Sequence, residues 1–412
     1  MVSHVTLIPP DESRMTPNER RSAFSLASIY AMRMLGLFMV MPVFMLEARH
    51  YQGGDDLSAI GMAMGVYGLV QAVLQIPFGM AADRFGRKRV IYLGLALLAL
   101  GSIVGATATS VSGLALGRAL QGGGAISAAV TALLADQTRD SVRTKGTALV
   151  GASIGLMFAL SLVLGPLLSG WGGLRAIFSV TLLLALSGVV IVRWWTPPEP
   201  ALPMAGEAKH SLWGLLVHPD LIRLNFGVFA LYAVQLASWV AIPALLIQAG
   251  VASADHGWVY LPAVLLSFVV MGVTLFPMER RGRLRPLFLG CIVLVMGVQA
   301  AWSLLAMSAP PLWVLAVLLF LFFCGFNVLE ASQPSLASRL APLGSRGAAL
   351  GVYNTLQSLG IFAGGALGGL LLKSVGASGV FLASTLLMLA WLGAAWRARF
   401  VHASPSGVGI TH

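Results

Sequence analysis

The sequence predicts an all-α membrane protein in which twelve transmembrane helices form two similar six-helix bundles. Of its 412 residues, 58% are hydrophobic and only 10% are charged, whereas a soluble domain carries about 25% charged residues. The apolar residues also gather in runs of about 20, the length that crosses a bilayer as a helix. Barrel strands need only about 10 alternating residues, so helices are the expected spanning form.

The first apolar run is expected to remain in the protein as a span. It follows Arg20 and Arg21 and continues to about Leu46, which is too long for the apolar segment of about 7–15 residues in a signal peptide. The twelve expected spans are 23–46, 58–80, 90–108, 111–134, 146–169, 174–195, 221–249, 257–277, 286–307, 311–337, 347–372 and 376–396.

The basic residues predict the orientation of these spans. If the N-terminus lies inside, 21 of the 26 Lys and Arg residues fall in cytoplasmic segments, and only Arg49, Arg175 and Lys373 fall outside. Cytoplasmic loops carry such an excess of Lys and Arg. Both termini are therefore expected in the cytoplasm.

A polar stretch at 196–220, rich in proline, divides the chain into halves at 1–195 and 221–412. We expect it to be a cytoplasmic linker between the two bundles. The halves also share a pattern, because the loop from Asp83 to Lys88 is matched 196 residues later by Glu279 to Leu284. Internal repeats of this kind are common in secondary transporters.

The loop between the second and third spans carries the strongest motif, from Gly79 to Arg89. Gly86 permits a tight turn, and Asp83 lies where a helix N-terminus favours negative charge. We expect Arg87 to reach an acid on another helix, with Asp136 the best candidate. The same residues equally fit a basic loop that only sets topology.

This loop resembles the signature of the major facilitator superfamily. The stretch from Arg118 to Ala125 resembles the fourth-span motif of its drug:proton antiporter branch, and Gly165, Pro166 and Gly170 resemble its fifth-span antiporter motif. The resemblance covers nearly the whole chain. Four stretches resemble one bacterial member in particular: Arg33 to Gly36, Pro42, Gln71 to Gly79, and Asn327 to Pro334.

Two departures from the family pattern stand out. Ala152, Ser161 and Ser169 occupy positions where the antiporter motif usually has glycines; they are small, so close packing survives. Relatives of the bacterial member can carry a soluble C-terminal domain, which we expect to be missing because the chain ends at His412, soon after its last span.

The resemblance implies that the bundles rock about a central cavity. It also implies that the Asp83 loop, with Arg87 and Asp136, latches one conformation, the outward-facing one, and that the eleventh span packs near Gly79. The expected latch residues are Gly79, Asp83, Arg84, Gly86, Arg87, Lys88 and Asp136.

Three ionisable residues lie within spans, where charge is costly and by default points to function. Arg33, Arg118 and Glu330 are therefore the candidates for proton coupling. Each of them also has a structural alternative. Arg118 could anchor hydrogen bonds, and Glu330 could pair with a loop arginine. Arg33 could extend its charged end to the cytoplasmic surface of the membrane.

Neutral polar and aromatic side chains within spans are candidates to line the cavity. The resemblance places spans one, four, seven and ten there, which favours Tyr232, Gln235, Trp239 and Asn327. Packing between helices explains each of them equally well.

Several classes of function are disfavoured. Both cysteines lie in apolar runs and the histidines lie in tails, loops or segment ends, so no metal site is expected. The pattern from Gly151 to Gly155 matches G-x-S-x-G but falls inside a span, and no span interior holds a histidine base, so we expect no enzyme. The net charge of +11 comes from loops, so no nucleic-acid partner is expected.

The sequence therefore predicts a proton-coupled secondary transporter of the bacterial inner membrane that exports amphiphilic small molecules by antiport. No cofactor is expected, because no nucleotide-binding loop is found and the proton gradient would supply the energy. A transporter of sugars or other metabolites is one alternative, and a membrane sensor or scaffold without transport is another. A monomer in the lipid bilayer is expected, because two bundles already enclose a cavity.

Overall fold

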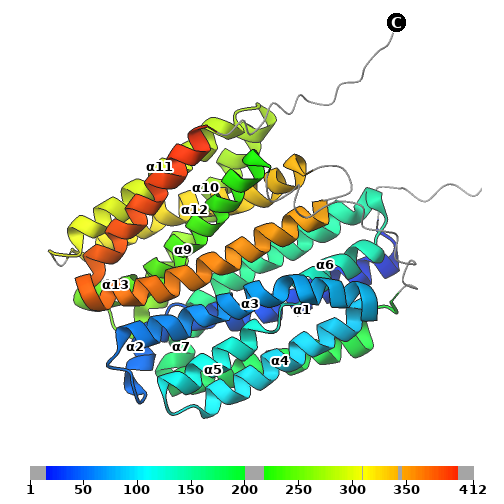
Figure 1. Cartoon of the computed structure of the whole chain (residues 1–412), viewed down its shortest axis with the longest axis horizontal. Coiled ribbons are helices and arrows are strands. Elements are labelled where there is room, and N and C mark those ends of the chain that lie inside the picture. The colour runs from blue at the N-terminus through cyan, green and yellow to red at the C-terminus, as the bar shows by residue number, and fades with distance from the viewer. Residues whose placement is uncertain (1–14, 200–217, 309, 342–345, 398–412) are drawn as a thin grey trace, which may run out of the picture.

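The computed structural model describes residues 15–199, 218–308, 310–341 and 346–397, and helices account for nearly all of them (Figure 1). Within these ranges the only β-type pairing is an isolated bridge between Gln52 and Ser110. The all-α prediction is confirmed. The helices are α1 Pro17–Val40, α2 Phe44–Glu47, α3 Leu57–Phe85, α4 Arg87–Thr107, α5 Val111–Gly122, α6 Ser127–Asp136, α7 Asp140–Val190, α9 Pro219–Gln248, α10 His256–Arg280, α11 Leu284–Leu305, α12 Leu312–Leu340 and α13 Arg346–Trp396.

Two of these helices are much longer than a bilayer requires. Both α7 and α13 contain 51 residues, about 76 Å of helix against a hydrocarbon core of about 30 Å. Glycines interrupt them: Gly173 has φ +60° in α7, and Gly376 has φ +78° in α13. Figure 1 shows the orange and red parts of α13 meeting at an angle. Each therefore accommodates two expected spans.

Nine helices in the described ranges are long and apolar enough to cross a membrane. The count of twelve spans stays a prediction, as do the orientation and the boundaries of the two halves. Most of the expected linker, residues 200–217, lies outside the described residues, as do both ends of the chain.

The expected fourth span, 111–134, is not one helix. It is divided into α5 and α6 by a break that includes Gly123 and Gly124. A Cβ at Gly122 would lie 2.2 Å from the carbonyl oxygen of Tyr67, and one at Gly124 would lie 2.7 Å from that of Gly94. The glycine run breaks the helix and lets the backbones of α3 and α4 approach it.

The two bundles meet along α3 and α13, which lie side by side in Figure 1. A Cβ at Gly61 would lie 2.6 Å from the Cα of Gly369, and one at Gly65 would lie 2.7 Å from the carbonyl oxygen of Phe362. These contacts occupy the half of α3 that follows Leu57. We call that end of the molecule the outer end, and the end that holds the Gly86 loop the cytoplasmic end, following the predicted orientation.

An ion pair also joins the bundles at the outer end. Lys373 Nζ lies 3.1 Å from Asp56 Oδ1, and both side chains are about half exposed. The hydrogen bond from Lys373 holds the pKa of Asp56 below its usual value. The outer end is therefore closed by both backbone contact and charge.

Candidate functional site

Arg33 of α1 is buried in the N-terminal bundle among neutral polar groups. It is 1% exposed and donates to Tyr67 Oη at 2.9 Å, Ser127 Oγ at 3.3 Å and Gln71 Oε1 at 3.5 Å. Its partners come from α3 and α6, so it ties three helices together. In the described part of the chain no carboxylate pairs with it, and a guanidinium stays charged at any ordinary pH.

Arg118 of α5 lies on the other side of the same tyrosine. Its Nη1 donates to Gln121 Oε1 at 3.0 Å, and its guanidinium carbon is 4.7 Å from the centre of the Tyr67 ring. A cation over an aromatic face is stabilised by the ring's negative face. Gln121 in turn donates to Ser102 Oγ of α4 at 3.0 Å.

The structure thus brings two of the predicted proton-coupling residues together through a third residue. Tyr67 contacts Arg33 with its hydroxyl group and Arg118 with its ring. Tyr67 did not stand out in the sequence, because an uncharged tyrosine in an apolar run carries no charge that points to function. Its spacing of four residues from Gln71 on α3 was the available clue, since such residues share a helix face.

Glu330 of α12 is the acid that the sequence places inside a span. It is partly buried, and Tyr232 Oη of α9 donates to its Oε1 at 2.6 Å. In the N-terminal bundle, Tyr30 of α1 donates to Ser127 Oγ at 3.1 Å, and Arg33 donates to the same oxygen.

The other predicted cavity residues pack within the C-terminal bundle. Asn327 Nδ2 donates to Ser267 Oγ of α10 at 2.8 Å. The Trp239 ring lies 5.0 Å from that of Tyr260. Gln235 is 6% exposed. Only Tyr232 among the four contacts Glu330 through a recorded hydrogen bond, so the assignment of the other three to a cavity stays a prediction.

The fifth-span motif places small residues at two helix contacts. A Cβ at Gly165 would lie 2.5 Å from the carbonyl oxygen of Met39 at the end of α1. A Cβ at Gly170 would lie 3.5 Å from the Cβ of Ala254 in the C-terminal half. Pro166 lies inside α7, where its ring removes one backbone hydrogen bond. The motif therefore shapes a contact within the bundle and one between the halves.

The ion pair expected between Arg87 and Asp136 forms within the N-terminal bundle. Arg87 pairs with Asp83 in a short contact, and its Nε lies 3.2 Å from Asp136 Oδ2. Gly86, with φ +103° and ψ 143°, makes the turn before α4. The guanidinium carbon of Arg84 lies 5.3 Å from the adjacent Phe85 ring.

The contacts of α3 with the eleventh span are closest toward the outer end, where a Cβ at Gly61, Gly65 or Gly68 would meet the backbone of α13. A Cβ at Gly79 would meet Ala128 of its own bundle at 3.9 Å. The packing of the eleventh span near Gly79 stays a prediction.

Glu199 binds the loop at Gly86 and was missed by sequence reasoning. Its carboxylate accepts from the backbone N–H of Arg87 at 2.5 Å and of Lys88 at 3.2 Å, so it caps the start of α4. A carboxylate at a helix N-terminus is stabilised by the helix dipole. Lys88 Nζ also donates to the carbonyl oxygen of Thr196 at 2.9 Å.

Two further contacts hold this segment against the N-terminal bundle. Gln137 Nε2 donates to the carbonyl oxygens of Pro197 and Pro198 at 3.1 and 3.0 Å. Arg21 donates to the carbonyl oxygen of Trp195 at 2.6 Å. The segment that leads into the linker is therefore bound to α1, to the Gly86 loop and to the end of α6.

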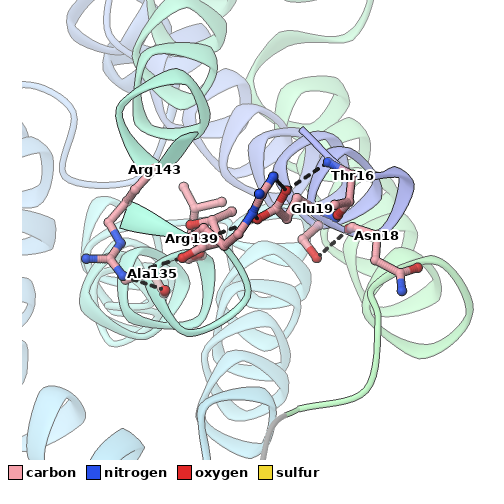
Figure 2. A network of polar contacts seen from close by, with 9 residues as sticks. Thr16, Asn18, Glu19, Ala135, Arg139 and Arg143 are labelled. Carbon is pink, nitrogen blue, oxygen red and sulfur yellow. Dashed lines mark hydrogen bonds and ion pairs between the residues drawn. The ribbon is translucent and has the colours of Figure 1, made fainter. Parts of the chain in front are cut away.

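A second ion pair lies at the same end (Figure 2). Arg139 Nε is 2.8 Å from Glu19 Oε1, and Arg139 Nη2 is 3.1 Å from Glu19 Oε2. The Glu19 carboxylate also accepts from the backbone N–H of Thr16 at 2.8 Å, completing a capping box at the start of α1. Figure 2 shows Glu19 and Arg139 pointing toward each other.

Comparison with known proteins agrees with this arrangement. The sequence profile of the Major Facilitator Superfamily matches residues 24–365. The chain belongs to this superfamily. It is 41% identical to the inner membrane transport protein YajR of Escherichia coli K12 over 93% of this chain and 84% of YajR. It is 28% identical to multidrug resistance protein 2 of Bacillus subtilis over 86% of this chain and 90% of that protein.

Solved structures of transporters share the fold. A bacterial homologue of the lysosomal transporter Spinster superposes with a TM-score of 0.75 at 14% identity, over 95% of this chain and 100% of that one. The human organic anion transporter MFSD10 superposes with a TM-score of 0.65 at 19% identity, over 92% of this chain and 100% of that one. The resemblance to YajR, the fold class, the absence of an enzyme function and the inner-membrane location are confirmed. The chain is a multi-pass transporter of small molecules.

Proposed function

We propose that the protein exports amphiphilic small molecules by proton antiport, with Glu330 as the proton carrier. The observation that carries this proposal is the hydrogen bond from Tyr232 to the Glu330 carboxylate, in a helix that spans the membrane. A charged carboxylate there is costly, whereas the protonated acid is neutral. Binding of one proton therefore changes the charge of the site by one unit.

Charge in the N-terminal bundle supports the proposal. Arg33 and Arg118 are each 1% exposed, and their recorded partners are neutral. A proton on Glu330 therefore changes the summed charge of the three residues by one unit. Tyr30 donates to Ser127 Oγ, the oxygen to which Arg33 also donates.

The latch supplies the conformational part of the mechanism. In alternating access the two bundles rock about a site between them. The bonds of Arg87 and Glu199 belong to the N-terminal half, so they hold its cytoplasmic end as one unit. Loss of such bonds shifts a balance between conformations by a few kcal/mol and leaves the proton site in place.

The choice of amphiphiles as substrates rests on relatives. Multidrug resistance protein 2 and the multidrug resistance protein MdtH of Aeromonas salmonicida are each 28% identical to this chain. The central aromatic side chains Tyr30, Tyr232 and Trp239 suit an amphiphile, since such rings offer an apolar face with a polar edge.

Proton movement in proteoliposomes with an internal pH dye tests the proposal. A panel of lipophilic cations, neutral drugs and sugars is added under an imposed pH gradient. We expect an amphiphile-dependent proton flux that is lost in Glu330→Gln and kept in Glu279→Gln, a matched change at a partly exposed acid in the last turn of α10. Flux that persists in Glu330→Gln would remove Glu330 as the carrier. Flux with sugars alone would favour a metabolite transporter.

A further inference from the structure

A cavity unrelated to the proton site lies at the cytoplasmic end of the C-terminal bundle. Its volume is about 540 Å³, and it opens between the start of α9 and the end of α13. Its lining residues are Arg223, Gly393, Ala394, Trp396 and Arg397.

The charge of this cavity is positive. Arg223 and Arg397 line it, and Arg285 of α11 comes close, because its Nη2 donates to the carbonyl oxygen of Trp396 at 2.9 Å. Arg223 pairs with Asp220 through Nη1 at 2.8 Å. An arginine carries five N–H donors, so this single contact leaves donors for a ligand. Two guanidinium groups at one cavity match the oxygens of a phosphate.

The shape of the cavity depends on small residues. A Cβ at Gly393 would meet no atom within 4 Å. Nearer the middle of the membrane, α9 and α13 pack closely, since a Cβ at Gly227 would lie 2.5 Å from Trp391 Nε1. The two helices therefore touch at Gly227 and leave room beside Gly393, where the arginines lie.

An apolar face of α13 leads to the cavity. Leu382, Leu386 and Leu389 are exposed, and they lie on the same helix face as Gly393 and Trp396 because the spacing alternates between four and three residues. Tryptophans such as Trp396, 65% exposed, gather at the level of lipid headgroups. The arginines of the cavity thus lie at the end of an apolar helix face that can contact acyl chains.

We propose that this cavity binds the phosphate of an anionic phospholipid from the cytoplasmic leaflet. Arg223 and Arg397 hold the phosphate, and Trp396 lies at the level of the glycerol. One acyl chain follows the exposed leucines of α13. A free phosphate ion shares the headgroup's charge but gains nothing from the apolar face, so the lipid is the occupant that uses both features.

Lipid retention by the full-length protein tests this proposal. The protein is reconstituted in vesicles of phosphatidylglycerol and phosphatidylcholine, extracted in mild detergent, and examined by native mass spectrometry. We expect preferential retention of phosphatidylglycerol. Each basic residue near an anionic surface contributes about 1 kcal/mol, or about fivefold in affinity. Removal of two in the variant Arg223→Ala/Arg397→Ala should therefore reduce the retention about twentyfold.

Two variants separate the cavity from general charge. Arg283→Ala removes an exposed positive charge at the same end but outside the cavity, and should keep the retention. Gly393→Leu fills the cavity without changing its charge, and this variant should no longer retain the lipid. Equal losses in Arg283→Ala and in the double variant would overturn the proposal. Displacement of the lipid by millimolar inorganic phosphate would also overturn it, because the apolar face would then contribute nothing.

Discussion

The two repeated loops at the cytoplasmic end share a glycine with positive φ but have different partners. Gly86 and Gly282 have φ +103° and +67°. In the first loop, Arg87 joins Asp83 to Asp136. In the second, Glu279 pairs instead with Arg339 from the end of α12. The repeat has preserved the glycine, while the connection between the helices and the ion pairs around it have diverged.

This difference separates two parts of the motif. The glycine is common to both bundles, whereas the ion pairs of the arginine occur in one of them. The turn glycine is needed wherever two antiparallel spans are joined this tightly. The bridge made by Arg87, together with the cap made by Glu199, occurs at the N-terminal loop. Substitutions at matched positions should therefore cost more stability in the first loop than in the second.

The largest effect is expected at the turn itself. Gly86→Ala places an L-residue at φ +103° and ψ 143°, a region with a cost of about 1–3 kcal/mol for other residues. Its Cβ would also lie 3.3 Å from Glu199 Oε2, whereas a Cβ at Gly282 would meet no atom within 4 Å. Thermal unfolding in detergent should show a larger loss for Gly86→Ala than for Gly282→Ala. Equal losses would mean that Glu199 adds nothing at this position.

The next effect is expected at the bridging arginine. The Arg87 side chain is 14% exposed, so Arg87→Ala should cost about 1–2 kcal/mol of unfolding free energy, more than an exposed pair does. Arg283→Ala, at the matched exposed position, should change it by less than about 0.5 kcal/mol. Chemical denaturation of both variants measures the difference. Similar values would show that the ion pairs of Arg87 are not stabilising.

A smaller effect is expected at the cap of α4. Glu199→Gln keeps the shape of the side chain but removes its charge, which should cost about 0.5–1 kcal/mol. Hydrogen exchange of the Arg87 and Lys88 amides should become faster, because these are the groups that the carboxylate binds. Amides in the middle of α4 serve as the internal control. Unchanged exchange at positions 87 and 88 would contradict the cap.

The smallest effect is expected at the second loop's acid. Glu279 and Arg339 are 34% and 48% exposed, and pairs this exposed contribute about 0–1 kcal/mol. Glu279→Gln should shift the unfolding free energy by less than about 0.5 kcal/mol. A loss as large as that of Arg87→Ala would show that the two loops are equivalent after all.

Much of the fold could be predicted from the sequence, because a helix that crosses lipid needs a long apolar run and because charge within such a run is costly. Long apolar runs placed the helices, and charge within those runs pointed to Arg33, Arg118 and Glu330. The division of 111–134 was missed, although the run from Gly122 to Gly124 signals a break.

The partners of these residues were harder to predict. Glu199 lies in a proline-rich stretch and binds a backbone N–H 112 residues away. Tyr67 carries no charge, so only the folded arrangement shows that it contacts two buried arginines. A charged residue inside an apolar span can be recognised in a sequence. The neutral residues that bind it can be identified only once the folded structure shows the contact.

The glycines between α3 and α13 bear on how the halves move. At Gly61 and Gly65 the two backbones touch with no side chains interposed. Interlocked side chains would have to separate before one helix could roll on the other, but smooth backbone surfaces can roll while staying in contact. At the outer end, therefore, no interlocked side chains at Gly61 and Gly65 need to separate when one helix turns against the other.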